Sequence, residues 1–306
     1  MKAITTSIIV IVISILTFVT ASAQKQNEYT GALLWKVSGN GLTKPSYILG
    51  THHLTHISFI DSIKGLKNII ESAEQTVGEL LMSDQSAMQG KFQQAAAMPA
   101  GESYSKLLSP EDYIKLDVGL KDMLGAGIDQ LGMFKPGMIS MIYTIAFYTK
   151  LYPEFNPMSH EAIDSYVQRI AKEKGKPVLG LETVEDQIRV VFDAEPLKDQ
   201  ARSLVCMIDN KEISKDQLNA LNTYYKKGQL DKMYNLSFNN PDDPCKMSQK
   251  QQNALNKDRN DKWIEKLPQI MKEKSSLIAV GALHLPAEDG LLYQLAKLGY
   301  TVEPVK

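Results

Sequence analysis

The sequence predicts an α/β protein with a mixed central sheet that is built from both ends of the chain, flanked by helices and interrupted by a large helical insertion. Runs rich in strand-forming residues lie near both ends, whereas apolar residues in the long middle recur at helical spacing. The chain of 306 residues is 43% hydrophobic and 23% charged, an ordinary composition for a globular protein with a sizeable core. No linker or low-complexity tract divides it.

Residues 1–23 are predicted to be a secretory signal peptide. Lys2 gives a short positive start, residues 4–19 form an apolar run, and Ala21-Ser22-Ala23 is a small-x-small cleavage sequence. An uncleaved membrane anchor is the alternative, but a span needs about 20 apolar residues and this run is shorter. We therefore expect residues 24–306 to form one domain that is periplasmic or secreted and has no stable membrane span.

The first part of the mature chain has the pattern of a β-hairpin, a helix and a third strand. Turn residues around Gly39 and Pro45 separate two runs of strand formers. The elements expected here are strands at 32–37, 47–49 and 76–81 and a helix at 59–73.

The middle of the chain, from about residue 85 to 170, is predicted to be helical and is rich in methionine. Ser109 and Pro110 have the order of an N-cap and a first helical residue. Residues 134–151 are largely apolar, and we expect a buried or groove-lining helix rather than a membrane segment because polar residues interrupt them. Ser159 is expected to cap a helix that ends near Lys174.

The last part of the chain returns to strands. A strand at 178–182 is followed by Thr183 and Asp186, which have the spacing of a helix cap. The remaining elements expected are helices over 197–272 with a break near 239–244, a strand at 277–280, a helix at 289–298 and a strand at 299–303.

Charge and cysteine content restrict the environment and the partners. Net charge is -1 and no segment is dominated by Lys or Arg, so nucleic acid and anionic membrane surfaces are not expected partners. Cys206 and Cys245 would form one disulfide in an oxidising compartment, closing a loop of about 40 residues; two unpaired buried thiols are the alternative.

The same short pattern, an apolar strand followed by Gly-x-x-His, occurs near both ends of the chain. Residues 47–49 lead into Gly50-x-x-His53, and residues 277–280 lead into Gly281-x-x-His284. Glycine directly after a strand allows a sharp turn and the close approach of a ligand. We expect the two turns to meet in space, with each imidazole at the lip of its turn.

Two glutamates stand at the other expected strand ends. Glu79 belongs to the run 76–81, and Glu182 ends the run 178–182. Ligands of open α/β sheets bind beyond the carboxyl ends of strands, so parallel strands would bring both histidines and up to two glutamates to one crevice. This donor set suits Zn²⁺, Mn²⁺ or Co²⁺ held by His53 and His284. A metal-activated water with a carboxylate as base would then hydrolyse a substrate.

Glu79, Glu182 and a nearby cation also have simpler interpretations. Glu79 fits a solvated strand residue, and Glu182 fits the favourable negative charge at a helix N-terminus. Arg259, in the polar run 257–261, is typical on its own of an exposed charge.

The remaining histidines have weaker patterns. His52 would point away from His53 if the strand continued, and His56 is either a ligand or a surface side chain, so which of the three binds stays open. His160, expected in the first turn of a helix, is interpreted as structural.

An ordered set of short pieces, together with this paired motif, resembles the TraB/GumN family, which includes the Tiki metalloproteases of animals. The resemblance covers nearly the whole mature chain and is weakest in the methionine-rich middle. The pieces are Leu34-Trp35, Tyr47–His53, Gly180–Thr183 with Gln187, Arg259-Asn260, Ala279–Leu285, Gly290–Leu292 and Leu298–Val302.

The resemblance implies a fold similar to the erythromycin-esterase and ChaN-like proteins, a mixed α/β core with helical insertions. Tiki members are metal-dependent proteases that use paired Gly-x-x-His motifs and an acidic residue. His53 and His284 match those histidines and Glu79 the acidic position, while Glu182 and Arg259 match other motif positions. Most bacterial members are of unproven activity, although TraB itself is linked to shutting down a peptide pheromone.

The function expected is an exported metal-dependent hydrolase, in particular a peptidase acting on a peptide or protein. In it His53 and His284 hold the metal, Glu79 or Glu182 completes the shell or acts as base, and Arg259 steadies a carbonyl oxygen or carboxylate. The main alternative is a non-catalytic protein whose crevice binds haem or a peptide, lined by the methionines between Met82 and Met141. An esterase with histidine as base and no metal is a third interpretation.

Overall fold

The computed structural model describes residues 29–82 and 85–305, so the predicted signal peptide lies outside the described residues. Its centre is a six-stranded sheet with the strand order β4-β3-β5-β2-β1-β6. The strands are β1 (Leu34–Gly39), β2 (Ser46–Thr51), β3 (Gln75–Gly78), β4 (Val178–Gly180), β5 (Ser276–Gly281) and β6 (Tyr300–Pro304).

Both ends of the chain build this sheet, as the sequence predicts. β1 and β2 form the expected antiparallel hairpin, and β6 pairs antiparallel with β1. β2, β5, β3 and β4 are parallel neighbours in that order. The mixed α/β class is confirmed, and the carboxyl ends of four parallel strands lie along one edge of the sheet.

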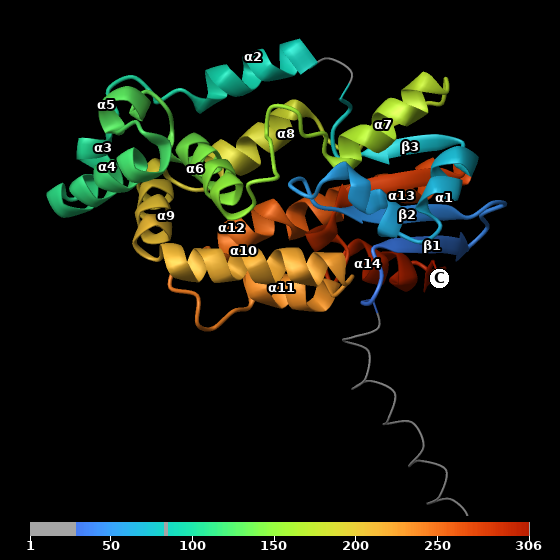
Figure 1. Cartoon of the computed structure of the whole chain (residues 1–306). Coiled ribbons are helices and arrows are strands. Elements are labelled where there is room, and N and C mark those ends of the chain that lie inside the picture. Colours follow the sequence, from blue (N-terminus) through green and yellow to red (C-terminus); the bar gives the residue numbers. More distant parts are fainter. Residues whose placement is uncertain (1–28, 83–84, 306) are drawn as a thin grey trace, which may run out of the picture.

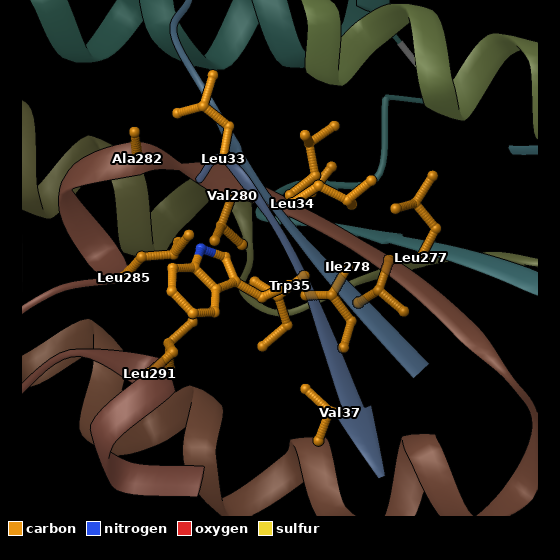
Figure 2. Packing of buried hydrophobic residues seen from close by; sticks show 14 of the residues in the cluster. Leu33, Leu34, Trp35, Val37, Leu277, Ile278, Val280, Ala282, Leu285 and Leu291 are labelled. Atoms are coloured by element: carbon orange, nitrogen blue, oxygen red, sulfur yellow. The ribbon is translucent and has the colours of Figure 1, made fainter. Parts of the chain in front are cut away.

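The central parallel strands β2 and β5 are mostly buried, which explains their apolar runs in the sequence, whereas no residue of the edge strand β4 is buried. Residues 277–280 of β5 are fully buried. Figure 2 shows Trp35 of β1 close to Leu285 and Leu291, so that the first strand and the segment after β5 share one core. This packing fixes the segment that carries the second Gly-x-x-His turn.

The helices divide between those that cover the sheet and those of the insertion. They are α1 (Leu66–Ser72), α2 (Gln85–Ala96), α3 (Tyr104–Leu107), α4 (Pro110–Leu124), α5 (Ile128–Leu131), α6 (Pro136–Leu151), α7 (Ile163–Glu173), α8 (Val184–Ile188), α9 (Leu197–Asp209), α10 (Lys211–Lys226), α11 (Leu230–Phe238), α12 (Gln249–Leu255), α13 (Lys257–Glu273) and α14 (Leu291–Lys297). In Figure 1, α7 lies above the sheet and α14 below it, while α3 to α6 and α9 gather beside it.

The insertion has a hydrophobic cluster of its own. Leu116 of α4, Ile139 and Tyr143 of α6 and Leu204 of α9 are among its buried members. Ser109 caps α4 with Pro110 at the first turn, as expected. α6 packs with one face into this cluster, and no helix in the described part of the chain is both long and apolar enough to cross a membrane.

Two predicted helices begin at other residues. The helix expected at 59–73 is two elements: a 3-10 helix (Ile57–Ser62) that ends at Ile63, and α1. Gly65, with a positive φ of 80°, lies between them as the N-cap residue of α1. The helix expected from Ser159 starts at Ile163 instead. The reason is tertiary: His160 donates from Nε2 to the carbonyl oxygen of His53 (2.6 Å) and stacks on Phe155, which holds this segment as a loop.

Cys206 and Cys245 form a disulfide. The two residues are 39 positions apart, and the bridge ties the segment between α11 and α12 to α9.

Replacing both cysteines, Cys206→Ser with Cys245→Ser, is expected to lower the free energy of unfolding by about 3–4 kcal/mol, because the unfolded chain regains the entropy of the closed loop. Urea unfolding measures this change. Dithiothreitol should lower the unfolding midpoint of the wild type and leave that of the double variant unchanged. A wild-type midpoint that is insensitive to reductant would contradict the assignment.

Candidate active site

The two Gly-x-x-His turns lie side by side at the carboxyl edge of the sheet. β2 and β5 are adjacent parallel strands, with Gly50 opposite Val280 and Thr51 opposite Gly281. A Cβ at Gly50 would lie 3.1 Å from the Leu285 side chain and 3.2 Å from the Cα of Ala282, so only glycine lets the second turn approach this closely. The expected meeting of the two turns is confirmed.

The glutamates after β3 and β4 point into the same region. Glu79 follows β3 directly, and its Oε1 accepts a hydrogen bond from the backbone N–H of Gly281 (2.7 Å) at the end of β5. Glu182 lies two residues beyond β4, and its backbone N–H donates to the carbonyl oxygen of Glu79 (3.0 Å). Both side chains are almost completely buried. Strand ends that are distant in sequence therefore bring two carboxylates together.

Arg259 of α13 joins these two carboxylates. Its Nε and Nη2 bind the two oxygens of Glu182 (3.0 and 2.6 Å), and Nη2 also binds Oε2 of Glu79 (2.5 Å). Nη1 donates to the carbonyl oxygen of Leu255 (3.3 Å) and to Nε2 of His284 (2.9 Å). A guanidinium has five N–H donors, and each of these five has a protein acceptor here. Arg259 has no donor left for a substrate in this arrangement.

His284 is held in one tautomer by partners on both ring nitrogens. The Asn260 side-chain nitrogen donates to the carbonyl oxygens of Asp289 (2.7 Å) and His284 (3.3 Å), so its oxygen faces Nδ1 of His284 at 2.8 Å. Nδ1 therefore carries the proton, and Nε2 accepts from Arg259. Burial, with the Arg259 charge nearby, lowers the pKa of His284 to about 3 against the opposing effect of Glu79. His284 is a neutral acceptor.

Glu79 stays ionised. Burial by itself raises the pKa of Glu79, but the Arg259 guanidinium and the Gly281 N–H help to lower it to about 2. A carboxylate of this pKa is a weak base at neutral pH. Its main effect is a fixed negative charge beside the two turns.

One face of α13 supplies the cation and its support. The guanidinium carbon of Arg259 lies 4.7 Å from the ring centroid of Trp263. The ring of His284 also contacts Trp263, with 4.5 Å between the ring centroids. Trp263 is fully buried and the Arg259 side chain is only 12% exposed. The sequence interpretation of Arg259 as an exposed charge is therefore wrong, because Arg259 and Asn260, although polar, face the interior of the protein.

His53 lies across a cavity from this network. The side chain is 61% exposed, and its Nδ1 lies 3.4 Å from Oδ1 of Asp164 in the first turn of α7. The hydrogen bond to Asp164 and the charge of its carboxylate raise the pKa of His53 to about 9. His53, Glu79 and Asp164 all line a cavity of about 480 Å³. His53 is therefore the one histidine of the first motif that faces the cavity together with Glu79.

The other two histidines of the first motif have local roles. His52 packs on Tyr225 (5.2 Å between centroids) and accepts from the Leu54 N–H, and burial lowers its pKa to about 4. His56 accepts from the N–H of Ser58 and caps the 3-10 helix. Neither contributes to the lining of the cavity.

The arrangement does not fit a divalent metal while Arg259 holds its place. Nε2 of His284 and Oε1 of Glu79 are 3.9 Å apart, but the lone pair of Nε2 already accepts from a cation. His53 turns its Nδ1 to Asp164 instead. Across residues 29–82 and 85–305, no group of three or more His, Cys, Asp or Glu side chains is placed to hold an ion. Metal binding by His53 and His284 stays a prediction that requires Arg259 to move.

Three residues of the site escaped the sequence interpretation. From the sequence, Asp164 cannot be told from other acidic residues that are favoured in a first helical turn. Trp263 likewise cannot be told from other apolar residues on the buried face of a helix. Asn260 stands beside Arg259 on α13 and is fully buried, but only the fold reveals that it orients His284.

A comparison with protein families matches residues 33–304 to a model described as TraB/PrgY/gumN family. The matched span includes every strand of the sheet and all the site residues described above. No curated protein and no solved structure matches the chain.

Substituting Arg259→Met, which keeps an apolar stem over Trp263, is expected to destabilise the fold by about 3–5 kcal/mol, because Glu79 and Glu182 lose their shared cation. Urea unfolding measures this cost. Added Zn²⁺ should then recover part of the lost stability, since Glu79, Glu182 and the lone pair of His284 become free.

The control for that experiment is Arg202→Met, which removes an exposed arginine and should change stability by less than about 1 kcal/mol. Zn²⁺ should leave the unfolding midpoints of the wild type and of this control unchanged. If Zn²⁺ raises the wild-type midpoint as much as that of Arg259→Met, the ion binds with Arg259 in place. That result would contradict the conclusion that Arg259 occupies the metal ligands.

Proposed function

The chain belongs to the TraB/PrgY/gumN family, and we propose that it is a hydrolase that adds water to the carbonyl carbon of a peptide or ester. The observation that carries this proposal is one cavity lined by both His53 and Glu79, at the edge of the sheet where the parallel strands end. One wall therefore holds a titratable imidazole and another a fixed carboxylate.

His53 is the proposed general base and acid. Asp164 accepts from Nδ1, which orients the ring and leaves Nε2 free for a water molecule in the cavity. In the neutral ring, which predominates above the pKa of about 9, Nε2 takes the water proton on attack, and His53 then returns that proton to the leaving amine or alkoxide. Asp164 and the carbonyl contact with His160 act on catalysis through His53, as positioning groups.

Glu79 and Arg259 have supporting roles in this proposal. Glu79 is ionised and held by Gly281 and Arg259, so it orients a water by accepting a hydrogen bond rather than by taking its proton. Arg259 has every donor engaged and serves to fix Glu79, Glu182 and His284. Gln187, whose amide nitrogen lies 3.4 Å from Glu79 and which also lines the cavity, is the proposed donor to the carbonyl oxygen.

The metal-dependent form of this function requires a different state of the site. Arg259 would have to release Nε2 of His284 before the predicted ligands became available, so no step here is assigned to a metal. A peptide or protein is the substrate that the resemblance implies.

Export to the periplasm or the medium is also proposed. The disulfide between Cys206 and Cys245 supports it, because such bonds persist mainly in oxidising compartments. Intact-mass analysis of the protein from its native cells should give an N-terminus near Gln24 and no thiol that can be alkylated. A mass that includes residues 1–23, with two free thiols, would contradict export.

Substituting His53→Ala is expected to lower kcat by about 10²–10⁴-fold, because the proton-transfer group is lost. Hydrolysis of a casein peptide mixture, followed by mass spectrometry, and of p-nitrophenyl butyrate measures the change. His56→Asn is the matched control: it lies in the same segment, and asparagine keeps the cap of the 3-10 helix. Equal rates for wild type and His53→Ala would contradict the assignment, and binding without turnover would favour the non-catalytic alternative.

A further inference from the structure

We infer that the cavity selects a substrate with a large, uncharged, apolar side chain beside the bond that is cleaved. This inference rests on the proposed function for its catalytic part, but it concerns a part of the cavity that does no chemistry. The apolar wall, defined as Leu80, Met82, Met88 and Phe92, faces the same space as His53 and Glu79.

The apolar wall is built by two elements. Leu80 and Met82 follow Glu79 on the segment after β3, and Gln168 fixes that segment by binding the carbonyl oxygen of Leu80 (3.0 Å) and the N–H of Met82 (3.1 Å). A side chain held by this wall would therefore lie close to Glu79, at the position of the reacting group.

The second element is α2, which spans the top of the molecule in Figure 1. Met88 and Phe92 are four residues apart, so they lie on one face of this helix and both line the cavity. Phe92 is backed by the buried ring of Phe192 at 6.1 Å, and Lys91 pairs with Glu185 of α8 at 2.6 Å. These contacts place the apolar face of α2 toward the chemistry.

The charged groups that line the cavity are already paired within the protein. His53 pairs with Asp164, and Glu79 pairs with Arg259. No lysine or arginine occurs among the described residues that line the cavity. A carboxylate would lose hydration without finding a free cation, and an ammonium would have to compete for carboxylates that His53 and Arg259 already hold. An apolar side chain would lose only unfavourable contact with water.

The volume of the cavity and the flexible methionine side chains of its wall indicate which apolar groups fit. A cavity of about 480 Å³ has room for a scissile amide and one side chain of the size of leucine, methionine or phenylalanine. Methionine side chains adapt to the shape of what they contact. The substrate class is therefore a peptide with a bulky apolar residue at the cleaved bond.

A binding experiment tests this without any turnover. In protein labelled with ¹³C-methyl methionine, the Met82 and Met88 signals are assigned by Met82→Leu and Met88→Leu. Titration with N-acetylphenylalanine amide should shift both signals and leave that of Met133, which is 66% exposed and outside the cavity, unchanged. The matching glutamate and lysine amides should shift neither. Equal shifts with all three amides, or shifts with none, would overturn the inference even if the protein is a hydrolase.

A kinetic experiment completes the test. Among N-acetyl amino acid anilides, kcat/KM for phenylalanine should exceed that for glutamate and lysine by at least about tenfold. Met88→Glu should abolish the preference over lysine by placing a carboxylate in the wall, whereas Met133→Glu should keep it. If Met88→Glu does not fold, Met88→Ala should lower kcat/KM for phenylalanine about tenfold and leave lysine unchanged.

The two failures are distinguishable. Turnover of all anilides at equal rates overturns the selectivity and leaves the proposed hydrolysis standing. Selective methyl shifts without turnover of any anilide support the apolar site and count against hydrolysis.

Discussion

The site depends on one constraint: a buried guanidinium must have an acceptor for every N–H and a counter-charge close by. Arg259 meets this requirement with Glu79, Glu182, the Leu255 carbonyl and His284. Each partner is fixed in turn by the backbone or by another side chain, as Gly281 fixes Glu79 and Asn260 fixes His284. The result is a closed network, meaning that every N–H of Arg259 has an acceptor within the protein, in which Glu79 is ionised and His284 is neutral.

The sheet makes this network possible. Only because β3, β5 and β2 are parallel neighbours do Glu79, Gly281 and Gly50 reach the same edge. α13 then carries Arg259 across that edge. The first turn of α7 and the loop before it carry Asp164 and His160 to the other side, against His53. Charged residues of the strand ends and of α7 line one part of the cavity between them, and apolar residues, among them Met88 and Phe92 of α2, line another.

The patterns that could be predicted from the sequence are local ones. An apolar run followed by Gly-x-x-His predicted β2, β5 and the meeting of their turns, because strand and turn preferences act within a few residues. The environment of Arg259 could not be predicted in this way, since its partner Glu79 is 180 positions away and its own neighbours are polar. For the same reason the contact between Asp164 and His53, which are 111 positions apart, could not be predicted. The start of α7 was misplaced because a tertiary contact of His160 outweighs the capping preference of Ser159.

The protonation state of His284 tests the closed network most directly, because both ring nitrogens report on it. A long-range ¹H–¹⁵N NMR spectrum of uniformly labelled wild-type protein at pH 7 and pH 5 distinguishes the tautomers, with His284→Gln for assignment. The hydrogen bonds to Asn260 and Arg259 require a neutral ring with the proton on Nδ1 and an unprotonated Nε2 at both pH values. An imidazolium ring, a proton on Nε2, or an Nε2 signal shifted by a bound metal would contradict it.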